Sequence, residues 1–238
     1  MGSSFFAALN TTLPCSAIVA EVSARGFALI PHVLSDTQQA SLLATLGSLT
    51  GAGRRGLLSE PAVAELATSA QLLELLRPHL PAEPRPVRAI YFDKSPEANW
   101  LVPWHQDLTL ALQQQVEVPG FGPWSVKDGI PHVQPPVELL EQMLTIRLHL
   151  DAADETNGAL KVLPGSHRHG RLSAERIQEF RANSPEALCT VEAGDALLMR
   201  PLLLHASSRA TRPGHRRVLH LEYAGFDLPA GLAWHEAA

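Results

Sequence analysis

The sequence predicts a mainly β protein with flanking helices. From Arg85 onward, short apolar runs alternate with turns rich in Gly and Pro, which is typical of strands. Over residues 143–151, aliphatic and polar side chains alternate strictly, as in a strand with one apolar face: Ile146, Leu148 and Leu150 against Thr145, Arg147 and His149. Before Arg85, the chain instead carries the caps and apolar spacing of short helices.

The N-terminal part, about residues 1–84, should be mainly helical. Residues 17–25 form an amphipathic segment closed by Gly26, and residues 27–30 read as a strand. Ser35 and Asp36 can cap a helix that runs to residue 46, where Gly47 ends it. A further helix is expected over residues 69–80, stopped by Pro81.

The core, about residues 85–225, should consist of strands joined by turns. The expected strands cover residues 87–92, 104–112, 143–151, 188–191, 196–200, 202–207 and 216–223. Asn157-Gly158 is a strong turn signal between strands, and residues 173–181 predict a short surface helix. No internal repeat or long linker interrupts the chain, so its 238 residues predict a single domain.

Composition excludes several classes of function. The net charge is −5 and no block of Lys or Arg occurs, so nucleic acid and anionic membranes are poor partners. Cys15 and Cys189 are the only cysteines, which argues against a disulfide framework. Neither a signal peptide nor a membrane span is apparent, so a cytoplasmic location is expected. No feature indicates an oligomeric state.

His105, Asp107 and His205 are the most informative residues of the chain. Two imidazoles and one carboxylate can occupy one face of an octahedral metal and leave three positions open, which suits Fe(II). If residues 104–112 form one strand, His105 and Asp107 point to the same side and reach one ion. Zn²⁺ accepts the same ligands, so spacing alone leaves the metal open.

The surroundings of these residues resemble the phytanoyl-CoA dioxygenase family of Fe(II)/2-oxoglutarate oxygenases. The similar stretches are Trp-His-Gln-Asp over residues 104–107, Asn-Gly at 157–158, Pro-Gly-Ser-His at 164–167, and His205 followed eleven residues later by Arg216. The resemblance covers roughly residues 85–225 and implies a double-stranded β-helix (a jelly roll, cupin-like).

The resemblance implies three cofactors or co-substrates: Fe(II), 2-oxoglutarate and dioxygen. His105, Asp107 and His205 would hold the iron. Arg216 would bind the far carboxylate of 2-oxoglutarate through paired charge-assisted hydrogen bonds, with help from Ser207. Arg217 would face the opposite side of the strand and could not replace Arg216.

The polar face of residues 143–151 is a second candidate for ligand contacts. If it faces the barrel interior, Thr145 would contact the co-substrate, and Arg147 and His149 would line the substrate pocket. The outer, solvent-facing side is the alternative. Asn99, Trp100 and Trp104, beside the predicted metal strand, would line the same pocket.

Residues 113–137 form a long Gly- and Pro-rich insertion directly after the predicted metal strand. Long loops in compact domains are often lids, although disorder is the competing interpretation. Phe121 and Trp124 could bury apolar surface when such a lid closes on substrate.

The expected function is hydroxylation of an unactivated C–H bond in a small metabolite or biosynthetic intermediate. Alternatives on the same iron are desaturation, cyclisation and halogenation, although the carboxylate of Asp107 opposes halogenation. A non-enzymatic jelly-roll binding protein is a further alternative, opposed by the presence of all three ligands and Arg216.

Overall fold

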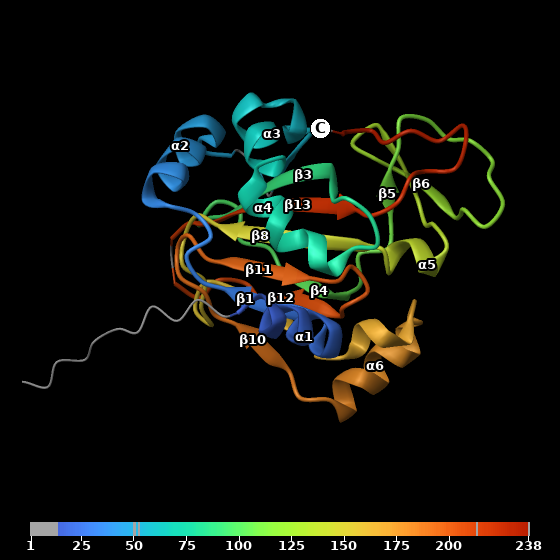
Figure 1. Cartoon of the computed structure of the whole chain (residues 1–238). Helices are drawn as coiled ribbons and strands as arrows, with labels where there is room; N and C mark the ends of the chain where they lie inside the picture. The colour runs from blue at the N-terminus through green and yellow to red at the C-terminus, as the bar shows by residue number, and fades with distance from the viewer. Residues whose placement is uncertain (1–13, 50, 52, 213, 238) are drawn as a thin grey trace, which may run out of the picture.

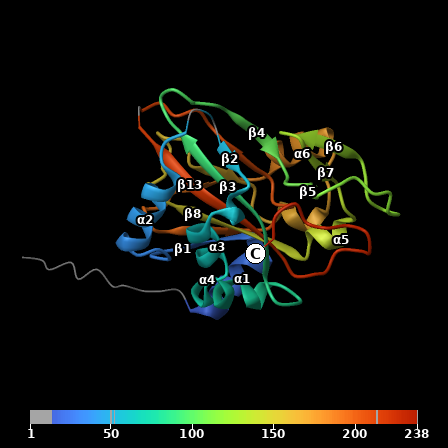
Figure 2. The ribbon, with the colours of Figure 1, turned by 90° about the horizontal axis from the view of Figure 1, so that it is seen from above.

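Two antiparallel sheets form the core of the protein (Figures 1 and 2). The computed structural model describes residues 14–49, 51, 53–212 and 214–237. The larger sheet has the order β1 (Phe27–Ile30), β11 (Ala196–Met199), β8 (Met143–His149), β13 (Arg216–Ala224), β3 (Arg85–Lys94), β2 (Gly53–Arg55). The smaller has the order β10 (Ala187–Cys189), β9 (Leu160–Val162), β12 (His205–Ser207), β4 (Val102–His105). This is the double-stranded β-helix implied by the resemblance.

Helices from the N-terminal part pack on the outer face of the larger sheet (Figure 1). They are α1 (Cys15–Arg25), α2 (Asp36–Leu46), α3 (Pro61–Ala67) and α4 (Ala70–Leu76), with 3₁₀ turns at Leu57–Ser59 and Arg77–His79. The Ser35 side chain caps α2 in a capping box with Gln38, as the sequence predicts. The helix expected over 69–80 is α-helical only to Leu76 and continues as the 3₁₀ turn, because Pro78 has no backbone N–H to extend the α-helical hydrogen bonds.

Two N-terminal strands belong to the same sheet as the C-terminal core. β1 pairs with β11, and β2 pairs with β3. The expected division near residue 84 is therefore a change of composition and not a break in the sheet. No helix in the described ranges is long and apolar enough to cross a membrane.

The two faces of β8 separate the main core from the barrel interior. Ile146 and Leu148 join the helices in the largest hydrophobic cluster, and their polar neighbours point the other way. Thr145, Arg147 and His149 are all buried, so the polar face lies inside the barrel and not in solvent.

The strand expected over residues 104–112 breaks after His105, which corrects the sequence prediction. The Gln106 side chain donates to the carbonyls of Gly170 (2.8 Å) and Leu202 (2.7 Å) and accepts from the backbone N–H of Leu172 (2.8 Å). These three hydrogen bonds fix Gln106 in a position where the chain no longer pairs with the smaller sheet. The strand expected over 202–207 likewise begins only at His205.

The 113–137 insertion contains a β-hairpin, β6 (Trp124–Lys127) and β7 (Ile130–Val133), that joins a small three-stranded sheet. The strands of this sheet have the order β5 (Leu110–Ala111), β7, β6, followed by α5 (Val137–Leu140). Asp128 and Gly129 both have positive φ, 51° and 78°, which builds a tight hairpin turn. The surface helix α6 (Ala174–Asn183) and a 3₁₀ turn at Ser166–His169 follow later in the chain.

Candidate metal and co-substrate site

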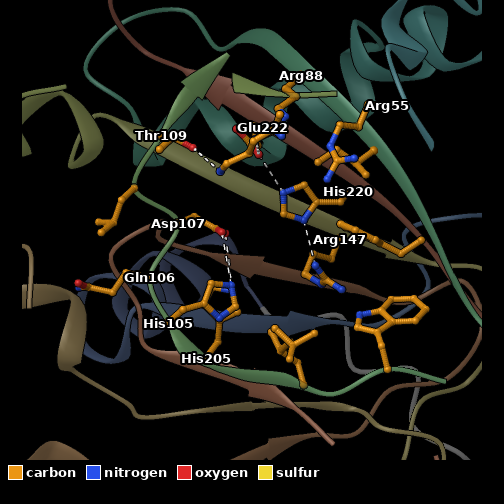
Figure 3. Close-up of a pocket in the computed structure, with 17 residues that line it drawn as sticks. Arg55, Arg88, His105, Gln106, Asp107, Thr109, Arg147, His205, His220 and Glu222 are labelled. Carbon is orange, nitrogen blue, oxygen red and sulfur yellow. Dashed lines mark hydrogen bonds and ion pairs between the residues drawn. The ribbon is translucent and has the colours of Figure 1, made fainter. Parts of the chain in front are cut away.

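Three potential metal ligands meet at the edge of the smaller sheet and face the barrel interior (Figure 3). His105 ends β4, His205 begins β12, and the two are paired in register with ring centroids 4.1 Å apart. Asp107 lies beyond the end of β4, where its backbone N–H donates to the carbonyl of Pro201 (2.9 Å). Its carboxylate oxygens lie 3.8 Å from His105 Nε2 and 3.7 Å from His205 Nε2.

These spacings suit a single ion. Two atoms that each lie about 2.1 Å from one metal can be at most about 4.2 Å apart. Both carboxylate–imidazole distances, 3.8 and 3.7 Å, are below that limit. Asp107 therefore reaches the ion although it has left the strand.

Backbone carbonyls set the tautomer of both imidazoles. His105 Nδ1 donates to the carbonyl of Pro103 (2.9 Å), and His205 Nδ1 donates to that of Leu203 (2.8 Å). Each Nε2 lone pair is thus free for a metal. Burial lowers the pKa of His205 to about 4, which keeps this ring neutral. Burial alone would raise the pKa of Asp107. The combined effect of His205, His220 and His105 is larger and opposite, so the pKa lies below its usual range.

A cavity of about 430 Å³ opens beside the ligand cluster (Figure 3). Its walls come from both sheets and from the insertion. Besides the three ligands, the lining residues are Arg55, Arg88, Ile90, Phe92, Trp100, Val102, Gln106, Leu108, Thr109, Lys127, Arg147, Leu160, His220 and Glu222. Aromatic and aliphatic side chains thus stand beside charged groups from strands far apart in sequence.

Arg216 is a buried guanidinium without a partner. It is 3% exposed, and its Nε and Nη1 make no hydrogen bond to any described residue. Burial, followed by repulsion from Arg147, lowers its pKa to about 9, which leaves it charged at neutral pH. Arg217, on the opposite face of β13, donates to Asp151 from Nε and Nη2, both at 2.7 Å. The two arginines therefore face different surroundings, as strand alternation predicts.

Lys94 is a buried cation that the sequence reasoning missed. It is opposite Arg216 in the β3–β13 pairing and 1% exposed. Its Nζ donates to Ser207 Oγ (2.7 Å) and to the carbonyl of Ser208 (2.5 Å). Burial, then the charges of Arg216 and Arg147, lower its pKa to about 7. The alternation of β3, with Phe92 on the same face, was the signal that could have placed it inside.

The Asn157-Gly158 turn supports Ser207. The Ser207 hydroxyl donates to the carbonyl of Gly158 (2.8 Å). Gly158 has φ +80°, and a Cβ there would lie 2.4 Å from the Ser208 carbonyl oxygen and 2.8 Å from Lys94 Nζ. Only glycine fits this approach, which explains the turn motif in structural terms.

Thr145 is not placed beside Arg216, contrary to the expectation of a co-substrate contact. It pairs with Glu222, six residues along β13 from Arg216, and it does not line the cavity. His149 is closer to Arg216, because it pairs with Val218. Both ring nitrogens of His149 are buried without a partner among described residues, and burial lowers its pKa well below the usual value.

Trp104 and Asn99 do not line the cavity either. Since His105 faces the interior, its strand neighbour Trp104 faces outward, where Arg181 lies 6.0 Å from its ring. Asn99 instead exchanges two hydrogen bonds with the backbone of Ala210, at 2.9 and 2.7 Å. Trp100, between them in sequence, is the aromatic residue that reaches the cavity.

Phe121 and Trp124 pack away from the cavity. Both join a second hydrophobic cluster formed by the insertion and the C-terminal segment around Leu232 and Trp234. The insertion instead contributes Lys127 to the lining. Both side chains are partly buried against this cluster, and their role in a lid that closes on substrate stays a prediction.

A chain of oriented hydrogen bonds runs along the cavity wall (Figure 3). Arg147 Nη1 donates to His220 Nδ1 (3.0 Å), and His220 Nε2 donates to Glu222 (3.3 Å). Arg88 donates to Glu222 (3.1 Å) and to His132 Nε2 (3.3 Å). Both ring nitrogens of His220 have a partner and Glu222 is paired with Arg88, whereas Arg147 Nε has no partner among the described residues.

The mouth of the cavity joins two distant segments. Arg55 of β2 forms an ion pair with Asp128 at the hairpin turn. Lys127, next to that turn, donates to Thr109 Oγ1 (3.3 Å). Burial, Arg88 and Arg55 lower the pKa of Lys127, which reflects three like charges converging there.

Comparison with known proteins identifies the family. The family model described as Phytanoyl-CoA dioxygenase (PhyH) matches residues 23–218. The chain belongs to this family. Among curated members, the mouse peroxisomal phytanoyl-CoA dioxygenase is 30% identical over 92 residues, which is 33% of this chain and 27% of the mouse protein. A probable phytanoyl-CoA dioxygenase of Caenorhabditis elegans is 27% identical over 92 residues, 33% of this chain and 30% of that protein. The match thus spans less than a third of either relative.

Solved structures share the PhyH-family fold at low sequence identity. AviO1 from Streptomyces viridochromogenes Tue57 has a TM-score of 0.67 and 22% identity, covering 92% of this chain and 99% of that one. EctD from S. alaskensis with 2-oxoglutarate and 5-hydroxyectoine has a TM-score of 0.67 and 19% identity, covering 92% and 78%. The α-ketoglutarate-dependent carbocyclase SnoK from nogalamycin biosynthesis has a TM-score of 0.65 and 18% identity, covering 87% and 83%.

Proposed function

We propose that this PhyH-family chain is an Fe(II)- and 2-oxoglutarate-dependent dioxygenase that hydroxylates an unactivated C–H bond of a small molecule. The observation that carries the proposal is the conjunction of two features in one barrel interior. One is an open three-ligand metal site, and the other is Arg216, a buried cation with two unpartnered donors. A zinc hydrolase has no need of the second feature.

The donor set fits both groups. His105, Asp107 and His205 would hold iron on one face and leave the cavity side open. Unpartnered guanidinium N–H groups are costly when buried, so Arg216 suits a carboxylate that arrives with the co-substrate. When bound, iron with 2-oxoglutarate supplies dioxygen activation coupled to oxidative decarboxylation to succinate and carbon dioxide.

The chain's own residues would position the substrate and exclude water. Ile90, Phe92 and Trp100 line the cavity with apolar surface beside the metal site. Such a surface favours a substrate C–H over solvent next to the metal. The rigid Glu222 network would form the opposing wall.

The substrate is proposed to be a small metabolite or biosynthetic intermediate. EctD, which shares the fold, was solved with 2-oxoglutarate and 5-hydroxyectoine, and SnoK comes from nogalamycin biosynthesis. Because SnoK is a carbocyclase, cyclisation, together with desaturation, is the second candidate outcome on the same site. The cytoplasmic location and the single-domain organisation stay predictions from the sequence.

The first experiment compares His205→Ala with His169→Ala, whose ring is exposed and stacks on Phe180. Anaerobic wild-type protein given Fe(II) and 2-oxoglutarate should develop a weak visible charge-transfer band. His205→Ala should lose it, with iron affinity down by more than roughly 100-fold. His169→Ala should keep it. A His205→Ala protein with full iron affinity would refute the ligand assignment.

The outcome on substrate is tested by product mass. A metabolite pool would be screened for compounds that stimulate succinate release by the wild-type enzyme. A product that gains one oxygen atom supports hydroxylation, whereas loss of two hydrogen atoms supports desaturation or cyclisation. An Fe(II)-loaded protein that binds no 2-oxoglutarate would instead favour a binding role.

A further inference from the structure

We propose that Arg147 is a second anchor for the co-substrate and binds the carboxylate at the metal end of 2-oxoglutarate. Arg216 would bind the far carboxylate, so the two arginines would grip both ends of the same molecule. The inference rests on the proposed function. It reassigns Arg147, which the sequence analysis placed in the substrate pocket.

Arg147 is directed toward the metal site from the opposite sheet. It projects from the centre of β8 into the interior and lines the same cavity as His105, Asp107 and His205 (Figure 3). Its charge lowers the pKa of both Asp107 and His205, which places it within Coulombic range of the two ligands. The mouth cations, by contrast, lie on β2, β3 and the insertion.

The guanidinium of Arg147 is held in one orientation and still has a free donor. Nη1 is fixed by His220 Nδ1 at 3.0 Å, and the group lies 5.7 Å from the Phe92 ring centroid. The residue is 7% exposed, and its Nε is buried with no partner among the described residues. An N–H group that is buried without a partner destabilises the protein, so a ligand that accepts a hydrogen bond from it is favoured.

Charge in the interior supports a dianion. Arg147, Arg216 and Lys94 form a cluster of mutually repelling cations, as the effects of the two arginines on the Lys94 pKa show. The inward-facing carboxylates of this region are committed elsewhere. Asp107 belongs to the metal site, and Glu222 is bonded to Arg88 and His220. A single carboxylate on Arg216 would leave Arg147 without a counter-charge.

The spacing of the two arginines suits a short dicarboxylate. Arg147 pairs with His220, and Arg216 is four residues from His220 along β13. Four residues of a strand span about 14 Å, and both long side chains reach inward from their ends. The charge of Arg147 lowers the pKa of Arg216, so the two guanidinium groups lie within Coulombic range of each other. A five-carbon dicarboxylate would bridge them with its metal end at Arg147.

The test compares two 2-oxo acids that share the metal end. 2-Oxoglutarate has both carboxylates, whereas 2-oxobutyrate lacks the far one. Each would be titrated anaerobically into Mn(II)-loaded protein, with Trp100 in the cavity wall as the fluorescence reporter. The variants are Arg147→Met, Arg147→Lys and Arg216→Met.

Arg147→Met should weaken both acids by a similar factor, about 10- to 100-fold, the loss of one charge-assisted contact. Arg216→Met should weaken 2-oxoglutarate alone. Arg147→Lys should recover part of the loss, because an ammonium still pairs with the carboxylate. Removing a buried unpaired charge is not expected to unfold the protein, and Mn(II) binding with an unchanged melting temperature would verify this.

Three results would overturn the inference. Unchanged 2-oxoglutarate affinity in Arg147→Met would mean that Arg147 contacts the primary substrate and not the co-substrate. Weakened binding of 2-oxoglutarate but not 2-oxobutyrate would place Arg147 at the far carboxylate. If Arg147→Met and Arg147→Lys lost the same affinity for the two acids and also lost Mn(II) binding, the role of Arg147 would be structural. A wild-type protein that binds neither acid would instead refute the proposed function itself.

Discussion

The two ends of the barrel interior differ in how their buried charges are satisfied. At one end, Arg216 and His149 have polar atoms without a partner among the described residues, and Lys94 donates to two neutral oxygens. At the other end, Glu222 accepts hydrogen bonds from both Arg88 and His220, so the buried carboxylate and guanidinium of this network are paired. Both ends are buried, with Arg216 3% and Glu222 8% exposed, so exposure to solvent does not satisfy the polar groups at either end.

The contrast separates a ligand site from a wall. Folded proteins pair nearly all of their buried polar groups, so a group left unpaired inside a well-packed barrel indicates something that binds there. A network that is complete without a ligand stabilises the shape of the cavity instead. Substitutions at the two ends should therefore have opposite consequences for stability and binding.

The largest effect is expected from Glu222→Leu. This change leaves Arg88 buried without its counter-charge and should lower the free energy of unfolding by about 3–5 kcal/mol. Urea unfolding of the metal-free protein measures it. Glu83→Leu, which breaks the exposed pair with Arg77, is the control and should leave stability unchanged. Similar losses of unfolding free energy in both variants would mean that the buried Glu222 pair stabilises the fold no more than an exposed ion pair does.

Arg216→Met should weaken the binding of 2-oxoglutarate and increase the stability of the protein without the co-substrate. Loss of a paired charge-assisted contact should weaken 2-oxoglutarate by about 2–4 kcal/mol, roughly 30- to 1000-fold. Without the co-substrate, removal of an unpaired buried charge should raise the melting temperature. Arg217→Met, which breaks the outward pair with Asp151, should change affinity little. Equal effects of the two on affinity would refute the assignment of the inner face.

Lys94 should give a smaller effect that depends on pH. Its folded pKa of about 7 lies below that of an exposed lysine, so the unfolded chain holds the proton more tightly. Stability should therefore rise with pH above 7, by at most about 1.4 kcal/mol per unit, and be lowest below pH 7. Lys94→Met should remove this slope in metal-free protein, whereas Lys161→Met should keep it. A slope that survives Lys94→Met would belong to another group.

Local patterns in the sequence predict much of the fold. The alternation around Ile146 and Leu148 predicts a strand with one polar face, although not which way that face points, and Ser35 predicts the start of α2. The order of strands does not follow from such patterns, because pairings such as β1 with β11 depend on contacts distant in sequence. The family resemblance supplied that order. The hairpin was missed although its signal, Asp128-Gly129, is local.

The site was predictable where motif spacing fixes it and not where register does. His105, Asp107 and His205 come together, and Arg216 lies in the interior. Thr145 was misplaced because its distance from Arg216 depends on how β8 and β13 pair. The sequence did not predict that Asp107 lies outside the strand, because the hydrogen bonds of Gln106 that end the strand join residues far apart in sequence. Lys94 was missed because a lone lysine in a strand suggests an exposed residue.

The ion pair between Arg55 and Asp128 links the protein's kinetics to ionic strength. It connects β2 to the hairpin across the mouth, with side chains 34% and 67% exposed. Dissolved salt screens exposed pairs over about 8 Å at physiological concentration. We expect added salt to loosen this link and to speed entry and exit of ligands, while the buried anchors keep their equilibrium affinity. Stopped-flow association rates of 2-oxoglutarate at rising NaCl, compared between wild type and Asp128→Asn, would measure how far this ion pair controls ligand entry.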